Sequence, residues 1–455
     1  MCYDSFESDE SHSVVVLSAR AVDLLMDALI QHAVGLAECS HAPVSSVKSR
    51  IAYIAAHGVS YASNGYAVRT HSVASALKGH GLDVLCMVQP GRPWSLTGSG
   101  VTSVTSVGPV EEIDGVRYVH SPLGKVASDP FDMISASAAT LQELFRVFRP
   151  SIVLAASDWK VGIPAWIAAS RMGLPFLNEI RGFWELSEAA KNPSYTERQV
   201  FREARALDTF VAQKAQHIFT LNPPMRDELV RRGVDASKIG LVPNAVRRRE
   251  TLPDAGSSEV RALRGRLGIQ SSDKVIGYIG SFNEYEGLDL LLDACHRLHR
   301  EGESFKLMLV GDDQPLANRL KPLSDRLVES GQDPVWLIRA GRVPHTEVQA
   351  YYALADVIVI PRKPYAVCQL VPPMKVVEAL SYGKRIVVSD VNPLAHYANQ
   401  YERIVACKAG DAGSLASGLM QALRSAAPTV GDEILMSNCV LPMVRTFVTL
   451  SEHPG

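Results

Sequence analysis

The feature that most constrains the fold of this sequence is an alternation of short apolar runs with longer segments of helical pattern. From residue 50 onward the runs have the length and β-branched content of buried strands: "RIAYIAAHG", "DVLCMVQ", "VRYVH", "SIVLAAS", "FLNEIRG" and "HIFTLN". Segments such as "GYAVRTHSVASALKGHG" and "ISASAATLQELFRVF" lie between several of them and have helical spacing. This alternation predicts a parallel sheet with helices on both faces.

The alternation is interrupted once and then starts again. Charge, Pro, Gly and Ser become frequent after Asn244, which indicates a linker over residues 245–273. A second series of strand-like runs follows: "KVIGYIGS", "KLMLVGDD", "VWLIRAGRV", "DVIVIPRK", "KRIVVSD" and "RIVAC". We therefore predict an α/β protein with two doubly wound, Rossmann-like domains over residues 49–244 and 274–425. Such domains bind ligands in the cleft at the carboxyl ends of their strands.

The two ends of the chain lie outside this pattern. Residues 1–48 contain "AVDLLMDALIQHAVGLAE", an amphipathic helix with Leu25, Leu29 and Ala33 in line. It is too polar to span a bilayer. Because its polar face is not basic, we favour a helix that packs against the protein or in a homodimer over one that contacts a membrane. Residues 426–455 contain the apolar run "NCVLPMVRTFVTL", which predicts a helix returning to the first domain.

Composition narrows the function classes. A length of 455 residues requires more than one core, and a net charge of -2 argues against nucleic acid as the main partner. The seven cysteines are scattered without a metal-ligand spacing, so we expect reduced thiols in a cytoplasmic protein and no metal site. The acidic "MCYDSFESDESHS" start lacks the basic segment of a secretory signal. "GDD" at 311–313 places two aspartates side by side without a further ligand.

The segment "PPMKVVEALSYGK", residues 372–384, carries the clearest chemistry. Its prolines suit the start of a helix and Gly383 suits the end, with Met374, Val377 and Leu380 predicted on the inward face. Lys375 and Glu378 then lie one turn apart on another face. A lysine near free N–H groups suits a diphosphate, and a carboxylate one turn further suits a vicinal diol such as a ribose. The alternative is an exposed Lys/Glu pair of small energetic value.

P-loop, dinucleotide-binding, HExxH and GxSxG motifs do not occur. Over about residues 50–424 the chain resembles the retaining glycosyltransferases of family 4, which have the two-domain GT-B fold. The resemblance is carried by "NGYAVRTHSVASALKGHGLDV", "IFTLNPPMRDELVRRGVDASKIGLVPNAV" and "GRVPHTEVQAYYALADVIVIPRKP…PPMKVVEALSYGKRIVVSD". The variant "YEGLD" indicates a subgroup of that family.

The resemblance implies a nucleotide-sugar site. In it, Glu378 holds the ribose, the amides around Leu370 and Val371 meet the diphosphate, and backbone near Val343 contacts the base. The remaining donor-site residues that it implies are Asn64 and Gly65 in the first domain and Gly280, Ser281 and Lys375 in the second.

This sequence departs from the family pattern at the diphosphate. Many members carry an arginine and a lysine where "YIGSFNEYEG" has Ser281 and Glu286, and Leu370 stands near the first glutamate of the usual two-glutamate motif. Lys375, Arg362 and Lys363 are the cations available to replace the missing pair. The other reading of these departures is an inactive donor site.

In the first domain, "NEIRGFWE" places Arg181 where many relatives have a histidine, with Glu179 and Glu185 nearby. Arg181 is a candidate to face the transferred sugar or the acceptor; the alternative is an ion-paired arginine at a strand end. The acceptor-site candidates are His57, Asp158, Trp159 and Glu185. His57 and His71 could equally be polar residues satisfied within the fold.

These observations predict a metal-independent, retaining glycosyltransferase that needs no cofactor beyond its nucleotide-sugar co-substrate. Lys375, Arg362 and Arg181 are its predicted catalytic residues, and a soluble small molecule is the favoured acceptor. Assembly of a polysaccharide or glycolipid at the membrane is the first alternative. A nucleotide-sugar epimerase and a non-catalytic partner subunit of the same fold are the others. The residues do not distinguish a UDP donor from a GDP donor.

Overall fold

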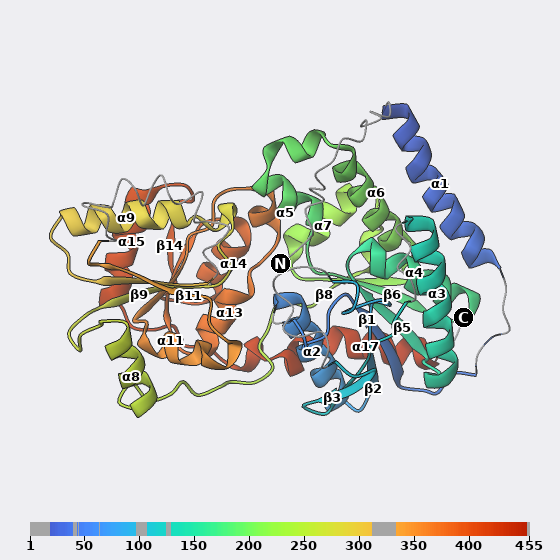
Figure 1. The fold of residues 1–455 in the computed structure, drawn as a ribbon, viewed down its shortest axis with the longest axis horizontal. Helices are drawn as coiled ribbons and strands as arrows, with labels where there is room; N and C mark the ends of the chain where they lie inside the picture. The colour runs from blue at the N-terminus through green and yellow to red at the C-terminus, as the bar shows by residue number, and fades with distance from the viewer. Residues whose placement is uncertain are drawn as a thin grey trace. The chain divides into compact units, whose positions relative to one another are not determined.

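The computed structural model describes residues 19–39, 43, 45–62, 64–96, 107–123, 129–311 and 334–452. They form two compact units, each with its own sheet (Figure 1). The first unit comprises Met1–Pro243 and Met436–Gly455, and the second comprises Asn244–Leu435. The acidic segment 1–13 and the two aspartates of "GDD" lie outside the described residues.

The first unit is built on a sheet of eight described strands in the spatial order β3-β4-β2-β1-β5-β6-β7-β8. Neighbouring strands are parallel except β3 and β4, which form an antiparallel hairpin. The strands are β1 Arg50–Ala55, β2 Asp83–Val88, β3 Val110–Ile113, β4 Val116–Val119, β5 Ile152–Ala156, β6 Phe176–Ile180, β7 His217–Thr220 and β8 Ile239–Leu241.

Two strands of this sheet, β3 and β8, were not predicted. β3 has the sequence VEEI, lies at the sheet edge and is largely solvent-facing, so it lacks the apolar pattern of a buried strand. Asp114 and Gly115, both with positive φ, form the tight turn from β3 to β4. β8 is only three residues long. An edge strand such as β3 does not need a continuous apolar sequence, and a strand as short as β8 is too short to form a recognisable apolar run.

Helices cover both faces of this sheet. They are α1 Ala19–Glu38, α2 Gly65–Gly79, α3 Pro130–Phe148, α4 Trp159–Arg171, α5 Trp184–Lys191, α6 Gln199–Lys214, α7 Pro223–Arg231, α16 Met436–Cys439 and α17 Leu441–Glu452. The C-terminal helix α17 contacts β5 and β8, and Phe447 packs edge-on against Phe219. The last helix of the chain thus belongs to the first unit.

The amphipathic helix α1 packs within its own chain. It lies on the outer side of α3, α4 and α6 (Figure 1). Leu29 and Ala33 are buried there as predicted, and His32 Nε2 lies 3.0 Å from Ser135 Oγ; the side chain of Leu25 lies outside the described residues. Within the described part of the chain, no helix is long and apolar enough to cross a membrane.

The second unit has a sheet of six described strands, all parallel, in the order β11-β10-β9-β12-β13-β14. All six lie in runs that the sequence predicts. The strands are β9 Val275–Ile279, β10 Lys306–Val310, β11 Leu337–Gly341, β12 Val357–Ile360, β13 Arg385–Ser389 and β14 Val405–Cys407. The helices are α8 Ser258–Arg266, α9 Leu288–Arg300, α11 Val348–Leu354, α12 Ala366–Leu370, α13 Met374–Ser381, α14 Asn392–Gln400 and α15 Ala412–Arg424.

Strand order determines where each sheet can bind a ligand. In the second unit, β9 and β12 are neighbours, but the connection after β9 leads to β10 on one side and the connection after β12 leads to β13 on the other. In the first unit, β1 and β5 are neighbours in the same way, with β2 on one side and β6 on the other. Parallel α/β sheets bind ligands at such reversal points, outside the carboxyl ends of the strands. We therefore expect ligand-binding residues in the segments that follow β9 and β12 in the second unit, and in those that follow β1 and β5 in the first.

Candidate functional site

In the second unit, two glycines shape the segment that follows β9. Gly280 has a φ of +149°, and a Cβ there would lie 2.0 Å from Lys375 Cε. Gly287 has a φ of +75°, and its Cβ would lie 2.0 Å from the carbonyl oxygen of Pro361. Between them, the 3₁₀ turn Glu284–Glu286 carries the buried Glu286. The glycines thus let this segment approach both α13 and the end of β12.

The helix α13 presents backbone N–H groups at the same place. Its N-cap is Pro373, and no side chain caps it. Because proline has no N–H, the first available amides are those of Met374, Lys375 and Val376. At the other end, Gly383 has a φ of +62° and the Lys384 N–H donates to Ala379 O at 3.0 Å. These are the predicted proline start and glycine stop.

The buried face of α13 differs in part from the prediction. Val377 and Leu380 are buried as expected, together with Val376 and Ala379. Met374, predicted to face inward, is only half-buried. The helix packs against β12 and β13, so it buries a wider stripe than the three residues chosen from the spacing.

Lys375 points from α13 onto the end of β9. Its Nζ lies 2.8 Å from Glu286 Oε2 and donates to Tyr278 Oη at 3.0 Å. The ammonium also lies 5.0 Å from the centre of the Tyr278 ring. Burial lowers the pKa of Lys375, and the Glu286 carboxylate opposes that shift. The lysine is therefore held in a fixed position beside Gly280.

Arg362 follows β12 and meets the same carboxylate. Its Nη2 donates to Glu286 Oε1 at 2.9 Å, and its Nη1 donates to Val371 O at 2.9 Å. Burial acts to raise the pKa of Glu286, but Arg362 and Lys375 outweigh it and bring that pKa down to about 2. Glu286 is thus ionised between two cations. Lys363 is instead paired with Glu284 and Asp289, at 2.8 and 2.7 Å.

Glu378 lies one turn beyond Lys375 and is half-buried. Tyr352 donates its hydroxyl to Glu378 Oε2 at 3.3 Å, and burial raises the pKa of Tyr352 well above its usual value. The tyrosine therefore stays a neutral donor to the carboxylate. This arrangement orients Glu378, which the helical spacing alone had singled out.

Two other predicted donor residues of this unit contact the cluster through their backbone: Val371 O accepts from Arg362, and Ser281 O accepts from Tyr278. The Val371 N–H donates to Val367 O at 2.8 Å, so that amide is already used within the chain. Ser281 O accepts from the Tyr278 hydroxyl at 2.7 Å. Val343 follows β11 and is half-buried.

In the first unit, Arg181 is an internal residue. Its Nε and Nη2 donate to Glu179 Oε2 at 2.8 and 2.6 Å. Nη1 donates to Thr70 Oγ1 at 2.8 Å and to Tyr66 O at 3.0 Å, and Nη2 also contacts Tyr53 Oη. A guanidinium has five N–H donors, and these contacts use all of them. The structure therefore replaces the prediction that Arg181 faces substrate with the alternative, a buried ion-paired arginine.

Glu179 links this arginine to a second one. Arg69 Nε donates to Glu179 Oε1 at 2.9 Å, and its Nη atoms donate to Val242 O and Pro243 O. Burial would raise the pKa of Glu179, but Arg181 and Arg69 bring it down to about 2. The cluster joins α2 and β6 to the segment that ends at Pro243.

Asn64 and Gly65 begin α2. Asn64 is the N-cap, and its side chain accepts from the Ala67 N–H at 3.0 Å. Gly65 is exposed at the first helical position. Both lie in the loop that follows β1, at the reversal point of the first sheet. This placement is compatible with ligand contact through Gly65, whereas the Asn64 side chain serves the helix.

The two histidines singled out from the sequence differ. His57, after β1, lies with its Nε2 2.9 Å from Arg92 Nη1, and burial followed by the Arg92 charge lowers its pKa to about 3. It is therefore neutral near pH 7. His71 is buried in α2, with Nδ1 2.9 Å from Tyr118 Oη. His71 thus fits the alternative of a polar residue satisfied within the fold.

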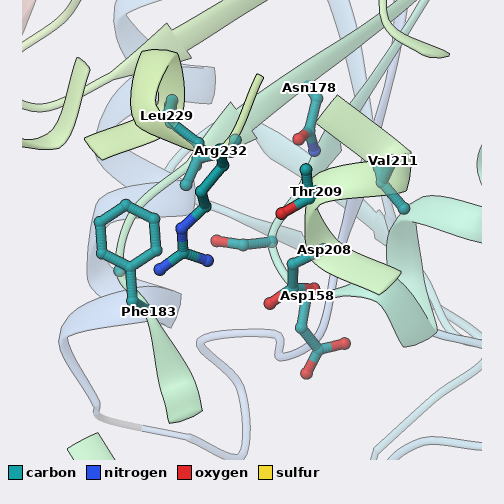
Figure 2. Close-up of a pocket in the computed structure, with 11 residues that line it drawn as sticks. Asp158, Asn178, Phe183, Asp208, Thr209, Val211, Leu229 and Arg232 are labelled. Carbon is teal, nitrogen blue, oxygen red and sulfur yellow. The ribbon is translucent and has the colours of Figure 1, made fainter. Parts of the chain in front are cut away.

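Of the remaining acceptor candidates, Asp158 lines a small cavity beside β5 and α6 (Figure 2), whereas Trp159 and Glu185 are not among its lining residues. Asp158 caps α4 by accepting from the Lys160 N–H, and the Trp159 N–H donates to Asp208 Oδ1 at 2.7 Å. The cavity volume of about 10 Å³ suits a single water. Burial and the neighbouring carboxylates of Asp158 and Glu185 raise the pKa of Asp208 well above its usual value.

Glu185 does not face this cavity as a free acceptor-binding group. It is fully buried and paired with Arg232 Nη2 at 2.6 Å. Arg232 in turn lies over the Phe183 ring at 4.2 Å and lines the cavity (Figure 2). This buried ion pair connects α5 to the end of α7 and stabilises the fold.

The geometry therefore assembles one charged cluster in the second unit: Lys375, Arg362, Glu286, Tyr278 and the start of α13. Sequence reasoning found the two cations but missed Tyr278, and it treated Glu286 only as a departure. The signal was present in "YIGSFNEYEG", because a carboxylate at that position calls for a buried cation. Among the described residues, no group of three His, Cys, Asp or Glu side chains could hold a metal ion.

Comparisons with known proteins agree with this architecture. The glycosyl transferase 4-like domain matches residues 64–245, and the glycosyl transferases group 1 domain matches residues 273–425. The chain is 29% identical over 143 residues to lipopolysaccharide 1,2-N-acetylglucosaminetransferase of Salmonella typhimurium, covering 30% of this chain and 35% of the relative. It is 24% identical over 263 residues to D-inositol 3-phosphate glycosyltransferase of Kineococcus radiotolerans, covering 55% and 59%. These matches span less than two thirds of either relative.

Solved structures share the fold over most of the chain. Sucrose-phosphate synthase of Thermosynechococcus elongatus has a TM-score of 0.61 at 15% identity, over 89% of this chain and 96% of that one. HepE of Anabaena, solved with UDP-glucose, has a TM-score of 0.57 at 13% identity, over 89% and 98%. UDP-GlcNAc 2-epimerase of Methanocaldococcus jannaschii has a TM-score of 0.52 at 11% identity, over 88% and 99%.

Proposed function

Because the chain belongs to the glycosyltransferases of the GT-B fold, with a glycosyl transferase 4-like domain followed by a group 1 domain, we propose that it transfers a sugar from a nucleoside diphosphate sugar to an acceptor. The transfer retains the anomeric configuration and needs neither a metal ion nor a cofactor. Its compartment is the cytoplasm, as the scattered cysteines predict. An epimerase shares this fold, so the same fold can carry a different reaction.

The observation that carries this proposal is the charged cluster at the reversal point of the second sheet. Lys375 and Arg362 supply two positive charges against the single negative charge of Glu286. The uncapped N-terminus of α13 adds amide N–H groups at the same place. A net positive, partly buried site with N–H donors suits a diphosphate.

Each residue then has a role in the proposed reaction. Glu378, oriented by Tyr352, accepts from the ribose hydroxyls of the donor. As the bond between the sugar and the diphosphate breaks, negative charge grows on the leaving diphosphate. Lys375, Arg362 and the α13 amides stabilise that charge, and they are in place before the reaction. The leaving diphosphate accepts the proton of the incoming nucleophile on the same face of the sugar, so no protein nucleophile is needed.

For the acceptor, we propose a soluble small molecule with a hydroxyl or thiol group. The near-neutral net charge supports this choice over an anionic membrane surface. The relative named lipopolysaccharide 1,2-N-acetylglucosaminetransferase supports the membrane alternative. Transfer to water-soluble acceptors and to vesicle-bound lipid acceptors, measured side by side, separates the two.

Calorimetric titration of the full chain with UDP and with GDP tests the donor class. UDP is the first probe because HepE, which shares the fold, is solved with UDP-glucose. We expect one nucleotide to bind and to raise the melting temperature, since a ligand of the folded state stabilises it by about 2.7 kcal/mol at a hundredfold excess over Kd. Binding should persist in excess chelator. Absence of binding by both nucleotides contradicts the proposal, and conversion of the donor sugar into its epimer without any acceptor points to an epimerase.

A further inference from the structure

Glu286 is the least expected member of the cluster. Its side chain is only 2% exposed, and it stands at the end of the turn Glu284–Glu286, just before the left-handed Gly287. A buried carboxylate costs several kcal/mol to desolvate unless it is paired. Here it is paired twice, by cations that come from different parts of the unit.

The two cations reach Glu286 from separate elements. Arg362 arrives from the end of β12 and bonds to Oε1 at 2.9 Å, and Lys375 arrives from α13 and lies 2.8 Å from Oε2. Each oxygen of the carboxylate therefore holds one cation. Glu286 forms an ion pair with both, so it constrains how far apart and in which direction the two charges lie.

Both cations keep unused hydrogen-bonding capacity. An ammonium has three N–H donors. Lys375 donates one of them to Tyr278 and forms an ion pair with Glu286 Oε2, an oxygen that has no hydrogen-bond partner in the described part of the chain. The buried Nε of Arg362 has no hydrogen-bond acceptor among the described residues. Glu286 thus balances one of the two positive charges of Lys375 and Arg362, and both residues keep N–H groups without an acceptor within the described ranges.

We propose that Glu286 is a positioning residue, which holds Lys375 and Arg362 in the orientation that binds the diphosphate of the donor. This inference rests on the proposed function. It explains the departure from the family pattern at Glu286. Where many members carry a lysine, this chain has a carboxylate, and the ammonium is supplied by Lys375 of α13 instead. The carboxylate also keeps Lys375 charged, although the site is buried.

The groups that face Lys375 make this last point testable. They are Glu286, Arg362, Tyr278, the Cys368 thiol and, on the same helix as Lys375, Glu378. The two carboxylates favour the charged lysine, whereas burial and Arg362 disfavour it. Removing the Glu286 charge should therefore lower the pKa of Lys375. Donor binding should then be lost at a lower pH as the pH rises.

The experiment compares UDP affinity of Glu286→Gln with that of the wild-type chain at about pH 6, far below the ordinary lysine pKa of about 10.4, and at about pH 9, closer to it. We expect a loss of ~10-fold or more at the higher pH, the scale of a hydrogen bond to a charged group, and a smaller loss at the lower pH. The ratio to wild type removes the titration of UDP itself. Glu286→Asp keeps the charge, so its loss of affinity should be the same at both pH values.

Glu284→Gln is the matched control. Glu284 lies on the same turn and forms an ion pair of the same 2.8 Å length, but its partner is Lys363. The side chain of Glu284 is 31% exposed, whereas that of Glu286 is 2% exposed. We expect its UDP affinity to equal that of wild type at both pH values. Melting temperatures of all variants, with titrations performed well below them, separate loss of folding from loss of binding.

The exchanged protein, Glu286→Lys with Lys375→Glu, decides the matter if Glu286→Gln does not fold. It should bind UDP ~10-fold more tightly than Lys375→Glu alone, because an ammonium again stands beside the diphosphate. No gain on exchange overturns the inference, as does a Glu286→Gln chain that binds UDP as tightly as wild type at both pH values. If the wild-type chain binds neither UDP nor GDP, the proposed function itself fails.

Discussion

Lys375 and Glu378 occupy neighbouring turns of one short helix but have different surroundings. Lys375 is enclosed by Tyr278, Gly280 and Glu286, whereas Glu378 is half-buried and touches the hydroxyl of Tyr352. The lysine suits a group whose charge changes during reaction, and the glutamate suits a group that only has to be recognised. We therefore expect different kinetic and binding effects when each is replaced.

Lys375→Ala should slow transfer more than it weakens donor binding. Leaving-group charge is greatest in the transition state, so a cation that stabilises it contributes more to kcat than to affinity. Turnover under donor saturation and calorimetric Kd for UDP give the two values separately. Equal losses in both would assign Lys375 to ground-state binding alone.

Glu378→Ala should weaken UDP by about 10- to 150-fold, the equivalent of about 1.5–3 kcal/mol for hydrogen bonds to a charged group. Binding of a 2′,3′-dideoxy analogue of UDP should be almost unchanged, because the analogue lacks the hydroxyls that Glu378 accepts from. Tyr352→Phe, which removes the hydroxyl beside Glu378, is the control and should have a smaller effect. Equal losses for UDP and for the analogue would contradict a ribose-binding role.

Arg181 shows that a polar residue at the end of a strand can be entirely internal. Arg181→Ala should destabilise the chain by about 3–5 kcal/mol, because it leaves Glu179 buried with part of its pairing lost. UDP affinity measured below the melting temperature should be unchanged. Arg146→Ala is the control: Arg146 pairs with Glu143 at the surface, so the cost should be about 1 kcal/mol or less. A normal melting temperature with impaired transfer would return Arg181 to the substrate site.

At the scale of elements, the glycine at the end of β9 connects backbone conformation to the charged cluster. Its positive φ and the Lys375 side chain above it leave no room for a Cβ. The approach of α13 to β9 therefore depends on this glycine. The positions of α13, the end of β9 and Lys375 are therefore coupled.

Gly280→Ala should displace Lys375 and reduce UDP affinity by ~10-fold, since a new Cβ would lie 2.0 Å from Lys375 Cε. Calorimetry with UDP measures the loss. Gly265→Ala in α8 is the control, because a Cβ at Gly265 would point into open space and alanine favours a helix by roughly 0.5–1 kcal/mol. If Gly280→Ala binds UDP normally, the lysine does not need its observed position.

At the scale of the whole molecule, both units use the same electrostatic device. Each has a buried carboxylate between two cations, Glu179 in the first and Glu286 in the second, and each carboxyl has its pKa lowered to about 2 from 4.5. Because the folded-state pKa is the lower one, these groups contribute stability above about pH 4.5. That contribution is lost as the pH falls towards 2.

The melting temperature should therefore fall steeply between about pH 4.5 and about pH 2. Glu286→Gln resembles the protonated carboxyl, so the difference in melting temperature between this variant and wild type should shrink across the same interval. Glu179→Gln should behave likewise in the first unit. Calorimetric scans at a series of pH values measure the differences. A gap that stays constant down to pH 2 would show that neither carboxylate titrates in that interval.

The sequence by itself determined the architecture. Apolar, β-branched runs need burial on both faces, and their alternation with helices leaves few arrangements other than a covered parallel sheet. The same reasoning located α13, because proline and glycine limit where a helix begins and ends. Lys375 and Glu378 could be singled out since helical spacing is a local property.

Only the tertiary structure decided what those residues touch. Glu286 and Lys375 are far apart in the chain, and nothing local predicts that β9, β12 and α13 bring them to 2.8 Å. The burial of Arg181 depends likewise on α2, β1 and β6 closing around it. Ion pairing and desolvation arise from packing between distant segments, so a spacing rule can identify a charged residue but cannot tell whether it serves the ligand or the fold.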